Sequence, residues 1–239
     1  VSDIAVTVDS ERPTVTYSAA GQKQPLVRAT AVIGADGVWS RTRTEVIGGP
    51  AAVSTGTTAW RALVPITDVD GALNLARTTM MLGSRFHVVA YPLPHRKAVN
   101  IVAFTPASQG AEAPSIKIRG NSRLEALLSA AVGTWTSWPL ATVNAPSWHR
   151  GPVGLIGDAA HAMLPFQAQG AAMGIEDATI LAPLLAGASN PQAAFAHFED
   201  VRRQRVERVV KLSAANGHIF HMSQPFARAR DLVIAAQGP

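Results

Sequence analysis

The sequence predicts a mixed α/β fold (α+β in its segregated parts) with a long helix near the carboxyl end. Two short apolar strands, at 29–33 and 151–157, each end in a glycine and an acid. Such an ending is typical of a strand that turns directly into a helix. Between them, 49–140 contains β-rich runs separated by Pro, Gly and Asp, which favours a mostly antiparallel sheet.

The remaining elements follow in chain order. Alternating residues at 4–8 and 14–18 predict a hairpin, with a second turn at 20–22. The β-rich runs of the middle region are 57–65, 86–92 and 99–105, followed by a polar, mobile loop at 110–122 and an amphipathic helix at 123–132.

Two helices are expected after the second apolar strand. An Ala-, Met- and Leu-rich helix spans 170–185, and a long helix runs from Gln192 to about Met222. Apolar residues recur along the long helix at helical spacing, which predicts one buried face made of Phe195, Phe198, Val201, Val206, Val209 and Leu212.

Composition excludes several classes of protein. The 239 residues contain no cysteine, so the chain can form neither disulfides nor thiolate metal sites, and no metal is expected. No apolar run reaches the roughly 18 residues of a membrane span, and no secretory signal precedes the domain. A soluble, cytoplasmic protein is expected, and the start at Val1 within a strand indicates a fragment.

The net charge of +5 raises the question of nucleic acid. The densest basic cluster comprises Arg202, Arg203, Arg205, Arg208 and Lys211, and it alternates with acidic residues on the long helix. That alternation favours a solvated face with ion pairs over a nucleic-acid surface.

The two strand endings point to one kind of ligand. A carboxylate at the end of a strand, as at Asp158, can accept hydrogen bonds from sugar hydroxyls, and ligands of open α/β sheets collect there. Small residues at Gly157, Ala159 and Ala160 allow a bulky ligand to approach. The helix that begins at Gly170 offers free N–H groups and a dipole that favour negative charge.

Together the segments Ala31–Arg43 and Gly154–Asp177 resemble the two conserved motifs, DG and GD, of para-hydroxybenzoate hydroxylase-like flavoprotein monooxygenases, especially the salicylate-hydroxylase branch. Trp60–Pro65 and Tyr91–Pro92 resemble strands of that family's substrate domain. The resemblance covers about Ile4 to Asp231. It implies an incomplete Rossmann-like FAD-binding domain with an inserted β-sheet substrate domain.

The resemblance assigns roles to individual residues. Asp36 and Arg43 would lie near the FAD pyrophosphate, Asp158 would bond the ribityl chain, and Pro165 would face the flavin where oxygen reacts. The full cofactor-binding set is Asp36, Gly37, Ser40, Arg43, Gly157, Asp158, Ala159, His161, Gln169, Gly170, Ala171 and Ala172. The expected catalytic residues are Pro165, Phe166 and Gln167, and the expected substrate residues are Arg61, His87, Val89 and Tyr91.

Four segments are expected: partial FAD-binding domain 1–48, substrate domain 49–142, FAD-binding continuation 143–187 and a helical segment 188–239. The family's amino-terminal GxGxxG, which holds the ADP half of FAD, is absent from this chain. A missing amino-terminal segment of the same protein is therefore an expected partner, beside an aromatic substrate and O2, and a homodimer is left open.

The reaction that the resemblance implies begins with hydride transfer from NADH or NADPH to FAD. Oxygen addition then gives a C4a-hydroperoxide, which hydroxylates a small phenolic acid of salicylate type. Two alternatives stay open: an FAD-dependent reductase of the same fold, and a truncated, non-catalytic flavin-domain fragment.

Several of these residues also have ordinary structural explanations. Asp36-Gly37 on its own is most often a turn. His161 can be a structural or cofactor-adjacent histidine, since no third metal ligand accompanies Asp158 and His161. Phe166 and Gln167 can line the substrate cavity or pack a loop. His87, Val89 and Tyr91 share one face of their strand, whereas the direction of Arg61 is undetermined.

Overall fold

The structure, a computed structural model, describes residues 3–9, 12–19, 22–23, 27–69, 71–117 and 120–236. The chain forms two compact units. The first comprises Val1–Val53 and Ala141–Ala214, and the second comprises Ser54–Leu140 and Ala215–Pro239. The long helix α4 (Pro191–Phe220) begins in the first unit and ends in the second.

The first unit begins with the expected hairpin. Strands β1 (Asp3–Asp9) and β2 (Arg12–Ala19) pair antiparallel, with Val6 opposite Val15. The short strands β3 (Gln22–Lys23) and β4 (Val27–Arg28) both pair with β2. The second turn, expected at 20–22, falls mainly on residues 20 and 21, which lie outside the described residues.

A second, three-stranded sheet holds the two strands that end in acids. Its order is β11-β12-β5, formed by β11 (His149–Arg150), β12 (Val153–Leu155) and β5 (Val32–Gly34). Strands β12 and β5 are parallel, with Leu155 opposite Gly34. Because both strands run in the same direction and stop in register, the acids that follow them, Asp158 and Asp36, lie at one edge of the sheet.

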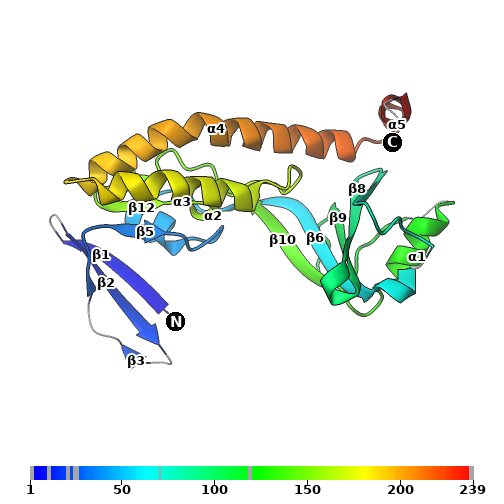
Figure 1. Cartoon of the computed structure of the whole chain (residues 1–239), viewed down its shortest axis with the longest axis horizontal. Helices are drawn as coiled ribbons and strands as arrows, with labels where there is room; N and C mark the ends of the chain where they lie inside the picture. Colours follow the sequence, from blue (N-terminus) through cyan, green and yellow to red (C-terminus); the bar gives the residue numbers. More distant parts are fainter. Residues whose placement is uncertain are drawn as a thin grey trace. The chain divides into compact units, whose positions relative to one another are not determined.

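Short helices follow two strands of this sheet, and two longer helices pack along it. After β5 the chain enters the short π-helix η1 (Thr42–Ile47), and after β12 the short helix α2 (Asp158–His161). Helix α3 (Gly170–Ala186) and the first part of α4 lie side by side along the sheet (Figure 1). Gly154 lets α4 come close, because a Cβ atom there would stand 2.2 Å from the Phe195 ring.

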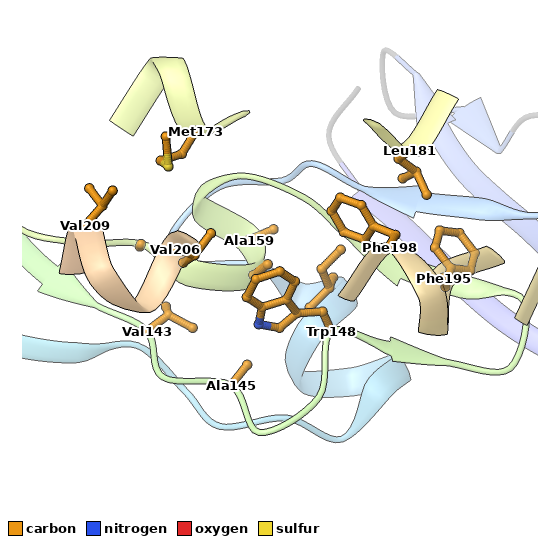
Figure 2. Close-up of a cluster of buried hydrophobic side chains, with 13 residues drawn as sticks. Val143, Ala145, Trp148, Ala159, Met173, Leu181, Phe195, Phe198, Val206 and Val209 are labelled. Carbon is orange, nitrogen blue, oxygen red and sulfur yellow. The ribbon is translucent and has the colours of Figure 1, made fainter. Parts of the chain in front are cut away.

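The core of the first unit lies between this sheet and its helices. Its buried side chains include Trp148 in the connection before β11, Met173 and Leu181 from α3, and Phe195 and Phe198 from α4 (Figure 2). The expected core role of Phe195 and Phe198 is confirmed, since each is 1% exposed. The expectation for Val201 and Leu212 was wrong: they are 48% and 50% exposed.

The second unit contains a five-stranded antiparallel sheet of order β10-β6-β9-β8-β7. The strands are β6 (Val53–Pro65), β7 (Thr79–Gly83), β8 (Phe86–Leu93), β9 (Ala98–Pro106) and β10 (Thr136–Thr142). The expected antiparallel sheet is therefore confirmed. Short 3₁₀ turns η2 (Ile66–Val69) and η3 (Pro94–Arg96) connect strands, and α5 (Phe226–Ala236) ends the described chain.

One face of this sheet is covered and the other is more open. Helix α1 (Ser122–Ala130) begins at Asn121, whose side chain caps the Leu124 N–H. Its Leu124 and Leu127 pack with Trp60, Val88 and Ile101 in the second core. No helix within the described ranges is long and apolar enough to cross a membrane.

Candidate cofactor and substrate site

The first acid turn is organised by Asp36. Its carboxylate accepts hydrogen bonds from the Ser40 hydroxyl at 2.5 Å and from the N–H and hydroxyl of Thr42, both at 3.0 Å. Burial raises the pKa of Asp36, but these hydrogen bonds outweigh that effect and leave the pKa below its ordinary value. The carboxylate is therefore ionised and fixed at the start of η1, while Gly37 supplies the left-handed turn with a φ of 78°.

Ser40 and Arg43 lie behind this turn. Ser40 is 1% exposed, and its hydroxyl also accepts the Arg43 N–H at 2.9 Å. The Arg43 guanidinium is 1% exposed and donates to the carbonyl oxygens of Val38, Pro50 and Ala159 at 2.7–2.8 Å. The side chain thus joins the backbone of the first turn to the backbone of the second. The expected position of Arg43 near the FAD pyrophosphate stays a prediction.

The second acid turn contains Gly157 and Asp158. Gly157 has φ 57° and ψ −141°, a conformation open essentially to glycine alone. Asp158 begins α2 with an exposed side chain, and none of the described residues donates a hydrogen bond to its carboxylate. Ala159 is instead completely buried in the core. Asp158 is thus the member of this turn that can accept hydrogen bonds from a ligand.

The start of helix α3 has the properties expected of an anion-facing helix end. Gln169 is its N-cap residue but makes no side-chain capping bond. Ala171 and Ala172 are exposed, and Gly170 has open space where a Cβ atom would stand. Uncapped N–H groups at a helix start favour a negatively charged partner.

His161 lies behind the second turn, 4% exposed, with its ring 5.0 Å from that of Trp148. Its Nε2 atom is 2.7 Å from an oxygen of Asp177, a buried carboxylate that sequence reasoning missed. This burial and the contact with Asp177 favour a structural role for His161. Asp177 stands 16 residues further on in another helix, so local sequence contains no signal for the pair.

Arg202 completes this buried group. The sequence predicts Arg202 on a solvated face of the long helix, and this is wrong: the residue is 3% exposed and its Nε atom donates to Asp177 at 2.8 Å. Its neighbours Arg203 and Arg205 do form ion pairs nearer the surface, with Glu199 and Glu176. In the basic cluster, Arg202 is therefore part of the buried core, whereas Arg203 and Arg205 form ion pairs closer to solvent.

The segment expected to face the flavin is a tight turn. The Pro165 carbonyl accepts the Ala168 N–H at 3.1 Å, and Ala168 has a φ of 52°. Pro165 is exposed, Gln167 is half-buried and Phe166 is 8% exposed. The Ser213 hydroxyl of α4 donates to the Leu164 carbonyl at 2.5 Å, which fixes the start of the turn.

The register of the five-stranded sheet settles the direction of Arg61. Arg61 is opposite Val102, and Val102 is opposite Val89, so these three side chains occupy the same face. His87 and Tyr91 share that face because they alternate with the core residues Val88 and Ala90. The four expected substrate residues therefore lie on the sheet face away from α1.

His87 differs from the others in being buried. It stacks on Phe104 with ring centroids 4.4 Å apart, and its Nδ1 is 2.7 Å from Nε2 of His221. Burial, followed by the neighbouring His221, lowers the pKa of His87 to about 3. Arg61 is exposed, and Val89 and Tyr91 are half-buried.

Comparison with known proteins identifies the class that this geometry indicates. Residues 4–213 match the family described as "FAD binding domain". The match extends over most of the chain, which therefore belongs to the FAD-binding domain family of flavoproteins. The expected resemblance to flavin-dependent hydroxylases is confirmed at the level of family.

Several of the similar proteins are aromatic hydroxylases. The chain is 31% identical to 3-hydroxybenzoate 6-hydroxylase 1 of Aquipseudomonas alcaligenes, over 89% of this chain and 57% of that protein. It is 30% identical to salicylate hydroxylase of Pseudomonas putida, over 87% and 56%. A solved salicylate hydroxylase substrate complex superposes with a TM-score of 0.73 at 27% identity, covering 95% of this chain and 64% of that one. The chain spans about half the length of the curated relatives it matches.

Proposed function

We propose that the complete protein is an FAD-dependent monooxygenase that hydroxylates a small phenolic acid, with NADH or NADPH and O2 as co-substrates. The observation that carries the proposal is the parallel pairing of β5 and β12, which brings Asp36 and Asp158 to one sheet edge. Membership of the FAD-binding domain family and the hydroxylases among its relatives support the same reaction.

The residues at this edge fit FAD. Asp158 has an exposed carboxylate that would accept hydrogen bonds from the ribityl hydroxyls. The backbone of Gly170, Ala171 and Ala172 would hold the pyrimidine edge, where a reduced flavin is negative. The first turn, with Gly37 at its surface, would lie near the pyrophosphate. When bound, FAD would supply the redox chemistry, accepting electrons from the nicotinamide and activating dioxygen.

The open face of the five-stranded sheet would hold the substrate. Arg61 has the charge and planar fork that recognise a carboxylate, and Val89 and Tyr91 offer apolar and aromatic surface on the same sheet face. His87 is 1% exposed, and because burial and the neighbouring His221 lower its pKa to about 3, its ring is neutral at neutral pH. In the first unit, Pro165, Phe166 and Gln167 are proposed to face the flavin where oxygen reacts and to exclude water there.

Substrate-stimulated turnover tests this proposal. The complete protein, loaded with FAD, is mixed with NADH or NADPH and a panel of hydroxybenzoates and hydroxypyridine acids, while nicotinamide oxidation and oxygen uptake are followed. A hydroxylase gives stimulated oxidation, matching oxygen uptake and a product heavier by one oxygen atom. Oxidation without oxygen in the product indicates the reductase alternative. Failure of the protein to retain FAD contradicts both.

A further inference from the structure

A single buried carboxylate connects three elements of the first unit. Asp177 of α3 is completely buried. One of its oxygens accepts the Gly157 N–H at 2.8 Å and lies 2.7 Å from His161 Nε2. The other accepts the Arg202 Nε–H of α4 at 2.8 Å. The Asp177 side chain thus bonds to one partner in the second acid turn, one in α2 and one in α4.

The hydrogen bond to Gly157 bears on the site directly. Gly157 immediately precedes Asp158, and its φ of 57° with ψ −141° is a conformation that glycine adopts readily and other residues do not. A backbone N–H fixed by a buried carboxylate cannot rotate without losing that bond. Asp177 therefore fixes the peptide from which the Asp158 side chain projects.

The same carboxylate keeps helix α3 against the turn. A Cβ atom at Gly157 would stand 3.7 Å from the Cα atom of Gly174, so backbone approaches backbone there. Asp177 lies one helical turn beyond Gly174 and bonds back to the same glycine. The helix whose N-terminus belongs to the proposed flavin site is thus tied to the turn that carries Asp158.

Electrostatics explains why the arrangement is stable. Burial raises the pKa of Asp177, but the contacts with His161, the Gly157 N–H and Arg202 lower it by more. The pKa therefore lies below its ordinary value, and the carboxyl stays ionised. Arg202 supplies the balancing charge, and its Nη1 also donates to Glu176 at 2.6 Å. Arg205 bonds Glu176 as well, nearer the surface. A buried charge without such partners would be strongly destabilising.

We propose that Asp177 is a positioning residue for flavin binding, which acts by holding the Gly157–Asp158 turn and is itself held by Arg202. The inference rests on the proposed function, because it takes the ligand of Asp158 to be FAD. It predicts that the influence of Asp177 on FAD affinity passes through the Asp158 carboxylate and disappears when that carboxylate is removed.

A double-mutant cycle tests this coupling in the complete protein. FAD dissociation constants are measured by flavin fluorescence for the unsubstituted protein, Asp177→Asn, Asp158→Ala and the double variant. Arg208→Met, an exposed arginine of the same helix, is the matched control. Near-UV circular dichroism and thermal unfolding establish that each variant is folded. If Asp177→Asn does not fold, Arg202→Lys replaces it in the cycle.

The expected result is an affinity loss of about tenfold for Asp177→Asn, equivalent to one hydrogen bond, and less than twofold when Asp158 is already alanine. Equal losses in both backgrounds would overturn the inference, since a merely structural role acts independently of Asp158. Unchanged affinity in Asp177→Asn would overturn it while leaving the proposed function intact. Absence of FAD binding by the unsubstituted protein would refute the proposed function as well.

Discussion

The guanidinium of Arg43 donates a hydrogen bond of 2.8 Å to the carbonyl oxygen of Ala159, a residue 116 positions away in the sequence. The same group bonds Val38 in the first acid turn. One buried side chain therefore joins the two turns that would hold the cofactor, which makes it a structural fastener of the site.

Replacing Arg43 with lysine is expected to lower the free energy of unfolding by about 2–4 kcal/mol, because a lysine cannot reach three carbonyls and leaves buried acceptors unpaired. Urea unfolding of the complete protein measures the change. Arg41→Ala is the control: its ion pair with Glu45 is on the surface, and the loss should stay within about 0.5 kcal/mol. Equal effects of the two variants would contradict the fastener role.

The close approach of Gly157 and Gly174 gives a second prediction. At Gly174 a Cβ atom would meet Gly157 at 3.9 Å, an ordinary contact, so Gly174→Ala should be tolerated or slightly stabilising in the helix. Gly174→Leu should destabilise by about 1–3 kcal/mol because the larger side chain must push α3 from the turn. Thermal unfolding compares them, and a stable leucine variant would refute the close packing.

His87 predicts a pH dependence of stability. Its pKa is lowered to about 3 in the folded protein, whereas an unfolded histidine titrates near 6.5. Between these values the unfolded state binds a proton that the folded state does not, so stability falls as the pH drops from 6.5 towards 3.

His87→Phe should reduce this pH slope by up to about 1.4 kcal/mol per pH unit, since it removes one titrating group. Phenylalanine retains stacking on Phe104. Urea unfolding from pH 7 to pH 4 measures the slope, with His95→Gln, an exposed histidine on η3, as the control. An unaltered slope in His87→Phe would show that the buried pair does not titrate as described.

Arg61 gives a prediction for the proposed reaction. Arg61→Met should raise the KM for a phenolic acid by about 10–100-fold, the cost of losing a charge-assisted contact, and should change kcat little. Steady-state kinetics measures both constants, and Arg96→Met, an exposed arginine of the same unit, should change neither. For a substrate that lacks the carboxylate, Arg61→Met should leave the KM unchanged. An equal rise in KM for that substrate would show that Arg61 does not recognise the carboxylate.

Sequence reasoning reached those parts of the fold and site that local pattern determines. The strand endings before Asp36 and Asp158, the helix from Gly170 and the antiparallel sheet all leave periodic or turn signals within a few residues. Family membership agrees with the resemblance that those motifs carry.

The failures arose where a side chain's direction depends on distant partners. Arg202 is charged and stands among other charged residues, so its sequence resembles a surface, yet Asp177 draws it into the core. Arg43 bonds the carbonyl of Ala159, 116 positions away, a contact that no local sequence pattern predicts. The face of Arg61 depended on strand register, which single strands do not specify.

The pairing of β5 with β12 also constrains the order of biosynthesis. Val32 finds its partner Val153 only after the whole inserted sheet has been translated, and Phe195 and Phe198 emerge later still. The strands from 53 to 106 are contiguous and can associate earlier on the ribosome. The nascent chain must therefore keep its first apolar strand unpaired while a second core forms, which leaves that strand open to misassociation during synthesis.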